Sequence, residues 1–399
     1  MSLTSRMPIQ IWILTLSAFA IGTAEFLIAG ILPQVADSLK ISTGQAGNLI
    51  TAYALAIVIG GPLLTLWLAR FEKRNVLIVL LGLFVAGNLI AAFSTDYTML
   101  LISRVVAGLT QGPFYGIGAV VATRMVAYNM AGRAVGQMFG GLTLANVLGV
   151  PAGAWIGNAF DWHTAFLVVA VMGVVAMLMI AVTIARSPEN KPASMLTQLS
   201  VFRDRNLLAS LTFTMLGWVG FMTLYGYIAP VAEQIAGFDR SAITWVLVVV
   251  GAGLVVGNSI GGRTADANLR RSLSLWPLAM IAALILVGFL AHYKWLFLVA
   301  AFIYGVTTFA NLPPMQMRVM KYGSKAPELA ATANISAFNI ANALGGFIGG
   351  AVIDSHLGAA AIPFAAAIIP VLGLLFIWSQ EARLAAQPKA AAPCVSLGN

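Results

Sequence analysis

The sequence predicts an all-α membrane protein with twelve transmembrane helices, arranged as two pseudo-symmetric six-helix bundles. Its 399 residues are 60% hydrophobic and only 9% charged, with a mean hydropathy of +0.92, whereas soluble globular domains are about 25% charged. The apolar residues form twelve runs of about 20 residues, each long enough to cross about 30 Å of hydrocarbon. Gly-rich segments recur in matching places in the two halves of the chain.

The predicted spans alternate with short polar segments. In order, they cover about 9–32, 46–68, 75–93, 98–123, 133–157, 164–185, 207–232, 243–262, 273–291, 295–317, 328–353 and 359–380. The first run is longer than the apolar core of a signal peptide, and no small-residue cleavage site follows it. We therefore expect it to remain in the mature protein.

The basic residues set the expected orientation. With both chain ends in the cytoplasm, 18 of the 22 Lys and Arg residues fall on the cytoplasmic side and only Lys40, Arg240 and Lys294 on the other, while Arg104 lies inside a span. Cytoplasmic loops of membrane proteins are enriched in these residues, so we expect both termini, including Cys394, to be cytoplasmic. The net charge of +9 reflects this topology and gives no reason to expect a nucleic-acid partner.

A polar stretch divides the spans six and six. Gly61 and Gly257 open similar segments after spans 2 and 8, and Gly149 and Gly345 lie in similar segments of spans 5 and 11, with an offset of 196 residues in both cases. Paired repeats with a site between them are typical of secondary transporters. The expected organisation is an N-terminal six-helix bundle over 1–185, a cytoplasmic linker over 186–206, a C-terminal six-helix bundle over 207–381 and a disordered cytoplasmic tail over 382–399.

Cysteine and histidine give little sign of a metal site. The single Cys394 lies in a polar tail, and His163, His292 and His356 fall in predicted extracytoplasmic loops, where an interfacial side chain is the more common interpretation. The chain has no phosphate loop and no clustered catalytic set. We therefore expect no enzymatic activity, no cofactor and no metal.

Small residues recur at every fourth position in four spans. They are Gly108, Gly112 and Gly116; Ala145, Gly149, Gly153 and Gly157; Gly253, Gly257 and Gly261; and Ala337, Ala341, Gly345 and Gly349. Such stripes let helices approach closely in lipid. Each one singly is interpreted as a packing seam, whereas four in equivalent spans suggest fitted surfaces that move against each other.

Six segments carry a family resemblance. They are "GTAEF" (22–26), "GPLLTLWLARFEKR" (61–74), "RVVAGLTQG" (104–112), "GLTLANVLGVPAGAWIG" (141–157), "GNSIGGRTAD" (257–266) and "NISAFNIANALGG" (334–346). Together and in this order they resemble the major facilitator superfamily, and within it the twelve-span drug–proton antiporters, especially the bacterial sugar (arabinose)-efflux permeases.

The resemblance implies the major facilitator fold and a monomeric protein of the bacterial inner membrane. Transport would be driven by a proton gradient with no cofactor, and the partners would be protons, lipid and a small-molecule substrate. Gly149, Pro151, Gly153 and Gly157 match the span 5 motif associated with antiport.

One departure from the family concerns the cytoplasmic gate. The family loop after span 2 usually has an Asp that pairs with an Arg and a helix N-terminus, but Ala69 stands at that position, and Glu72 replaces the usual Gly. The second half keeps Asp266 beside Arg263. Either Glu72 substitutes for the missing Asp, or the gate depends more on the C-terminal half. The residues assigned to gating are Arg70, Glu72, Arg74, Arg263 and Asp266.

Glu25 is the one acidic residue well inside a predicted span, and Arg104 is the one deep basic residue. An ionised group at the bilayer centre costs about 2.5–3.5 kcal/mol on insertion scales, so both should face protein or water. Counting about 1.5 Å per residue places both about 10 Å below the outer surface. The resemblance implies that their spans line the central cavity. There Glu25 can carry the coupled proton, which is the preferred hypothesis, or form a static ion pair with Arg104.

Aromatic and amide side chains within the spans are candidates for the substrate-binding wall. They are Tyr53, Gln111, Tyr115, Asn146, Trp218, Phe221, Tyr225, Asn311, Asn334, Phe338 and Asn342. Amides can hold sugar hydroxyl groups, and aromatic faces can hold sugar rings or flat drugs. Helix packing is an equally good interpretation of any one of them.

These observations predict a proton-coupled efflux transporter that exports a sugar or an amphipathic drug-like compound by alternating access. One alternative keeps the fold but makes the protein an importer or a uniporter. Another is a membrane sensor that transports nothing. A sensor should carry an appended domain or a long charged tail, and the short Ala/Pro-rich tail argues against it.

Overall fold

The computed structural model describes residues 7–41, 43–186, 195–239 and 242–386. Within this part of the chain every regular element is helical, as the apolar runs predict. Cys394 and the remainder of the predicted tail beyond Ala386 lie outside the described residues.

The N-terminal half contains six crossings. Its helices are α1 (Ile9–Leu39), α2 (Thr43–Leu55), α3 (Gly61–Leu68), α4 (Lys73–Ala92), α5 (Tyr97–Arg124), α6 (Ala131–Leu144), α7 (Val150–Ala159) and α8 (Trp162–Thr183). A π-helical turn, η1 (Ala56–Gly60), joins α2 to α3 in one crossing, and a second, η3 (Ala145–Gly149), joins α6 to α7.

The C-terminal half follows a short helix α9 (Met195–Leu199). Its helices are α10 (Arg205–Tyr225), α11 (Ile228–Gln234), α12 (Ile243–Leu290), α13 (Lys294–Phe309), α14 (Leu312–Tyr322), α15 (Pro327–Ile353) and α16 (Ile362–Ala386). As in the first half, short helices pair to make single crossings, α13 with α14 being one such pair.

The described chain has eleven helical segments long and apolar enough to cross a membrane, one fewer than predicted. The difference lies in α12, whose 48 residues include Asn268 in a non-helical conformation at φ −160° and ψ 96°. At about 1.5 Å per residue this helix is about 72 Å long, more than twice the thickness of a bilayer core. Divided at Asn268, α12 supplies predicted spans 8 and 9, and the number of crossings returns to twelve.

Several helices extend beyond their predicted ends, two of them notably. Helix α1 continues to Leu39, seven residues beyond its predicted end. Helix α16 continues to Ala386, so the first five residues of the predicted disordered tail are helical. The last turns of α16 are fastened by Glu381, which forms ion pairs with Arg270 and Arg318.

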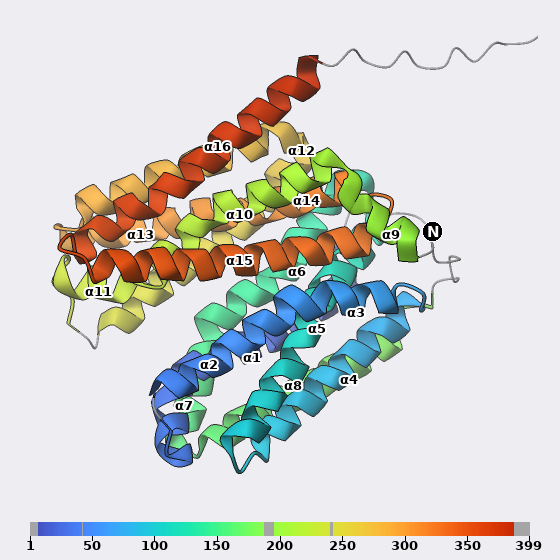
Figure 1. Ribbon diagram of the computed structural model, residues 1–399, viewed down its shortest axis with the longest axis horizontal. Helices are drawn as coiled ribbons and strands as arrows, with labels where there is room; N and C mark the ends of the chain where they lie inside the picture. Colours follow the sequence, from blue (N-terminus) through green and yellow to red (C-terminus); the bar gives the residue numbers. More distant parts are fainter. Residues whose placement is uncertain (1–6, 42, 187–194, 240–241, 387–399) are drawn as a thin grey trace, which may run out of the picture.

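The two halves meet at one end of the molecule. In Figure 1 their ribbons lie together near α3 and α9 and diverge toward the end that carries α7 and α11. At the closed end, Lys73 of α4 contacts Glu328 of α15, and Asp266 of α12 contacts the start of α6. This is the end that carries the Lys- and Arg-rich loops.

The small-residue stripes mostly fasten helices within one half. A Cβ on Gly257 would lie 2.0 Å from the carbonyl oxygen of Val306, and one on Gly345 would lie 2.5 Å from that of Val219. Among the glycines of these stripes that the structure describes, those on α5 reach the other half, where a Cβ on Gly116 would lie 2.2 Å from Thr332 Oγ1. The prediction that all four stripes mark moving surfaces is therefore wrong, because close backbone packing serves stability inside each bundle as well.

Candidate functional site

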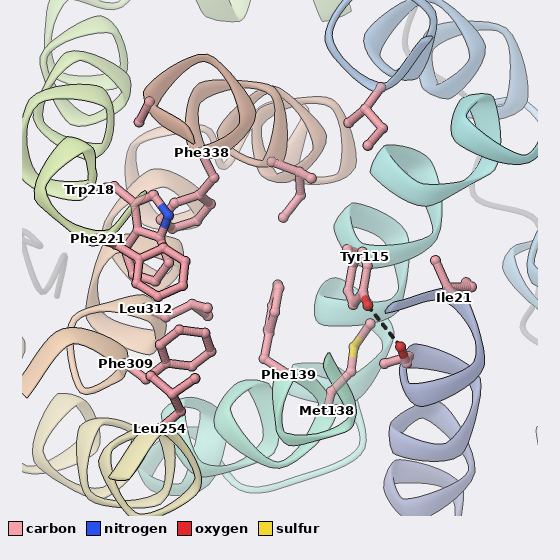
Figure 2. Close-up of a cluster of buried hydrophobic side chains, with 14 of the residues drawn as sticks. Ile21, Tyr115, Met138, Phe139, Trp218, Phe221, Leu254, Phe309, Leu312 and Phe338 are labelled. Carbon is pink, nitrogen blue, oxygen red and sulfur yellow. Dashed lines mark hydrogen bonds between the residues drawn. The ribbon is translucent and has the colours of Figure 1, made fainter. Parts of the chain in front are cut away.

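A cavity of about 490 Å³, including its opening, lies between the two halves. The N-terminal half lines it with Glu25, Phe26, Gln111, Tyr115, Phe139, Leu142 and Asn146. The C-terminal half lines it with Trp218, Phe221, Phe309, Leu312, Ile335, Phe338, Asn339 and Asn342. Figure 2 shows the two walls facing each other, with Tyr115 and Phe139 opposite the aromatic group around Trp218.

The C-terminal wall is an aromatic cluster centred on Trp218. Its ring centroid lies 4.8 Å from that of Phe338, 5.0 Å from Phe221 and 5.4 Å from Phe309. The indole Nε1 donates a 3.0 Å hydrogen bond to Asn342 Oδ1, which fixes the ring orientation. Such a surface can hold the apolar face of a small molecule and leaves amide groups at its edge for hydrogen bonds.

The N-terminal wall carries the charged group. Gln111 Nε2 donates a 2.8 Å hydrogen bond to Glu25 Oε2, and Tyr53 donates through its hydroxyl to Gln111 Oε1 at 2.7 Å. Hydrogen-bonded side chains therefore link three helices, α1, α2 and α5, at the cavity wall. Because an ionised carboxylate can only accept, the donor from Gln111 suits the charged form of Glu25.

Arg104 lies level with Glu25 but does not pair with it. Its guanidinium donates a 2.8 Å hydrogen bond to the Ala24 carbonyl oxygen and lies 4.3 Å from the centroid of the Tyr53 ring. Among the described ion pairs, none within 4.0 Å joins Arg104 to Glu25. The static ion pair considered from the sequence does not occur, because a ring face and a carbonyl oxygen hold the buried guanidinium instead.

The predicted substrate residues fall into two groups. Those on the cavity wall are Gln111, Tyr115, Asn146, Trp218, Phe221, Phe338 and Asn342. Those behind it are Tyr53, Tyr225, Asn311 and Asn334. Asn334 donates to Gln316 Oε1, and Asn311 donates to the Thr307 carbonyl oxygen, as helix-packing amides do.

Several lining residues were not predicted. They are Phe26, Phe139, Leu142, Phe309, Leu312, Ile335 and Asn339. Phe139 stacks on Tyr115 with ring centroids 5.2 Å apart. An aromatic residue in an apolar span carries no signal that separates a cavity wall from a lipid face. Asn339 could have been predicted, because it is an amide within an apolar span, five residues after the predicted Asn334.

The C-terminal half supplies the predicted gate contact. Both carboxylate oxygens of Asp266 accept hydrogen bonds from the first turn of α6, one from Gly132 N and one from Arg133 N at 3.0 Å. Arg133 Nε lies 3.8 Å from Asp266 Oδ2. Asp266 thus joins a helix N-terminus and an arginine of the opposite half, where the helix dipole favours a negative charge. Arg263 lines a cleft at the same end, together with Arg133.

The N-terminal half closes by a different contact. Glu72 accepts hydrogen bonds from Arg74 N and Asn75 N and so caps its own helix, α4. The side chain that crosses to the other half is Lys73, whose Nζ lies 3.3 Å from Glu328 Oε1 at the start of α15. The sequence did not single out either residue of this pair.

The two arginines assigned to the first gate loop serve within the N-terminal half. Arg70 packs over the rings of Trp67 and Phe71, at 4.9 and 4.8 Å from the centroids. Arg74 donates to the Ala181 carbonyl oxygen of α8.

The protein family follows from comparison with known proteins. The family model described as "Major Facilitator Superfamily" matches residues 14–350.

This chain belongs to the major facilitator superfamily.

The inner membrane transport protein YdhP of Escherichia coli (strain K12) is 38% identical over 365 residues, which cover 92% of this chain and 94% of that protein. A probable sugar efflux transporter of Mannheimia succiniciproducens is 31% identical over 369 residues, covering 92% of each. The crystal structure of the fucose:proton symporter FucP of E. coli shares the fold, with a TM-score of 0.76, 15% identity and coverage of 96% of this chain and 100% of that one. The chain is a multi-pass inner-membrane transporter of this superfamily.

The glycines of the segment that resembles the span 5 motif pack closely against α1. Gly149 ends the π-helical turn η3, and Pro151 lies in the first turn of α7. A Cβ on Gly149 would lie 2.2 Å from Thr23 Oγ1, and one on Gly153 would lie 2.2 Å from Leu27. Gly157 likewise lies against Ile31 of α1. These glycines therefore hold η3 and α7 tightly against α1, the helix that carries Glu25.

Proposed function

We propose that this protein is a proton-coupled antiporter that exports a small molecule by alternating access between its two halves. The observation that carries the proposal is the position of Glu25, the one carboxylate among the residues that line the cavity. A carboxylate on the wall of a cavity between two moving halves can exchange its proton with either side of the membrane in turn.

The lining residues favour a substrate with an apolar ring face and hydrogen-bonding groups. Trp218 and its aromatic neighbours offer the flat surface, and Asn146, Asn339 and Asn342 offer amide groups. A sugar or an amphipathic drug-like compound fits this description. The similarity to a probable sugar efflux transporter supports the first of these.

The closed end sets the direction of access in this structure. The halves meet where Lys73 and Asp266 make their contacts, and loops rich in Lys and Arg face the cytoplasm in membrane proteins. We therefore infer that the cytoplasmic side is closed here and that the cavity exchanges with the opposite side.

The test is proton-driven transport by the Glu25→Gln variant in proteoliposomes, screened against a panel of sugars and amphipathic cations. The amide imitates the protonated carboxyl, and a neutral group is easier to bury, so the variant should fold normally. It should bind substrate and exchange it for substrate, yet lose uphill transport driven by a pH gradient.

Asp354→Asn is the matched control, because Asp354 lies at the end of α15 outside the cavity. It should transport like the wild type. Full gradient-driven export by Glu25→Gln at normal stability would overturn the proton-carrier role. If the wild-type protein instead takes up substrate together with protons, the protein is an importer and the proposed export is wrong.

A further inference from the structure

Three side chains connect the proposed proton site to the contact between the halves. Glu25 accepts from Gln111, and Gln111 accepts from Tyr53. Gln111 and Tyr53 are each only 2% exposed, so neither hydrogen bond competes freely with bulk water. Gln111 is the central member, since it alone contacts both of the others.

The primary amide of Gln111 can serve this chain in two orientations. With Glu25 charged, Nε2 must face the carboxylate and Oε1 must face the Tyr53 hydroxyl, as observed. With Glu25 protonated, the carboxyl gains a donor, and a rotated amide can accept it through Oε1 while Nε2 donates to the Tyr53 oxygen. The rotation reverses the direction of the whole hydrogen-bond chain and leaves the Tyr53 hydroxyl without its acceptor.

The ionisable groups that face Glu25 are few. Arg104 and Tyr115 come from α5 and Tyr53 from α2. The hydroxyl of Tyr115 already donates to the Ala18 carbonyl oxygen at 2.9 Å, and Arg104 is held by Ala24 and by the Tyr53 ring. From the crossing of α6 and η3 the polar wall residue is Asn146, which does not titrate. Gln111 is therefore the group best placed to respond to the proton.

Tyr53 leads directly to the other half. It lies one turn before η1, a π-helical turn, and such turns leave backbone carbonyls outside the regular helical pattern. In η1 the carbonyl oxygens of Ile57 and Val58 both accept from Ser336 Oγ of α15, at 3.3 Å each. A change at Tyr53 can therefore reach the contact between η1 and α15 through little more than one turn of helix.

We propose that Gln111 is a positioning residue whose amide orientation reads the protonation of Glu25 and passes it, through Tyr53 and the π-helical turn η1, to the contact with Ser336 of the other half. This inference rests on the proposed function, because it assumes that Glu25 gains and loses the coupled proton. It adds a physical link between protonation and the closure of the halves.

The test measures closure of the purified protein against pH. Spin labels at Phe160 and Tyr293, introduced as Phe160→Cys and Tyr293→Cys in a Cys394→Ser background, report the separation of the halves at the end opposite the gate. Both positions are exposed, at 72% and 62%. Double electron–electron resonance distances are recorded from acidic to alkaline pH for the wild type and for each variant.

Two variants distinguish the response of Gln111 to protonation of Glu25 from the passage of that response to the other half. Gln111→Leu removes the donor to the charged carboxylate, so the midpoint of the transition should move to higher pH by about one unit, a tenfold change in proton affinity. Tyr53→Phe keeps the ring under Arg104 and removes only the hydroxyl, so the midpoint should stay while the size of the distance change falls by at least half.

Tyr304→Phe is the control. It removes another buried hydroxyl, which donates to the Phe221 carbonyl oxygen, and should change neither quantity. If Glu25→Gln keeps the wild-type pH response, the proposed function fails. If Glu25→Gln abolishes that response while Gln111→Leu and Tyr53→Phe both behave like Tyr304→Phe, the amide mechanism is wrong and the proton-carrier role stands.

Discussion

The N-terminal half supplies the ionisable side chain of the cavity, whereas the C-terminal half supplies most of its aromatic surface. Glu25 and Gln111 lie on one wall, and Trp218, Phe309 and Phe338 lie on the other. Both halves have the same helix order, so this difference comes from side chains and not from topology. A duplicated fold can thus place a carboxylate on one wall of a shared cavity and an aromatic cluster on the other.

The two gate loops differ in the same way. In the C-terminal half, Asp266 binds backbone N–H groups at the start of α6, and its side chain is only 4% exposed. In the N-terminal half, Lys73 forms an ion pair with Glu328, with side chains 17% and 11% exposed. Thr65 and Thr332 add a 2.9 Å hydroxyl contact beside this pair. The fold determines where the halves meet, and each half closes that place with different chemistry.

A third pair of equivalent positions makes the same point. Arg74 and Arg270 are 196 residues apart. Arg74 donates to a backbone carbonyl oxygen of α8, whereas Arg270 forms a 3.2 Å ion pair with Glu381 of α16. Glu381 also contacts Arg318. The C-terminal half therefore has a charge network where Arg74 of the N-terminal half donates to a backbone carbonyl oxygen.

The largest effect on closure is expected from Asp266→Asn. This change removes the charge from two hydrogen bonds to N–H groups at a helix N-terminus, an interaction of about 1.5–3 kcal/mol for charged partners. The closed population should fall about tenfold to a hundredfold. Spin-label distances between Tyr128 and Ser324, which are exposed at the gate end of opposite halves, measure it.

Ala69→Asp is the control for that experiment, because it restores the family's Asp in the half that lacks it. It should leave closure unchanged or strengthen it. If Asp266→Asn has wild-type distances and transport, the Asp266 contact does not control closure, and the proposed difference between the two gate loops is wrong.

An intermediate effect is expected from Trp218→Ala. Truncation removes the ring that contacts Phe221, Phe309 and Phe338 and should lower substrate affinity about tenfold, since an aromatic contact of this size is worth about 1–2 kcal/mol. Isothermal titration with the substrate found in the transport screen measures it. Phe289→Ala, at a ring that is 67% exposed, is the control. Equal losses in Trp218→Ala and Glu25→Gln would contradict the division of roles between the walls.

The smallest effect is expected from Lys73→Met. A partly exposed ion pair contributes about 0.2–1 kcal/mol, so closure should weaken by at most about fivefold. Exchanging the charges, with Lys73→Glu and Glu328→Lys together, should restore it. The same Tyr128 and Ser324 labels serve here. A loss larger than that of Asp266→Asn would reverse the ranking of the two gates.

Much of the candidate site was accessible from the sequence because charge and amide groups are conspicuous in apolar spans. Glu25 was singled out by its depth alone, and the equal level of Arg104 is confirmed by its contact with Ala24. The partner of Glu25 was predicted less well. A helix-face argument places Arg104 and Gln111 on one side of α5 but cannot say which of the two reaches the carboxylate.

The sequence by itself determined the all-helical membrane class of the protein and the carboxylate deep in the first span, because the cost of placing charge in hydrocarbon limits where such residues can occur. The tertiary structure alone decided that Gln111 contacts Glu25, that Lys73 reaches Glu328, and that Phe139 and Phe309 line the cavity. In an apolar span most residues suit lipid and protein equally well, so hydrophobicity cannot say which face meets the other half. Only the packing of the two bundles distinguishes a residue that lines the cavity from one that is packed between helices.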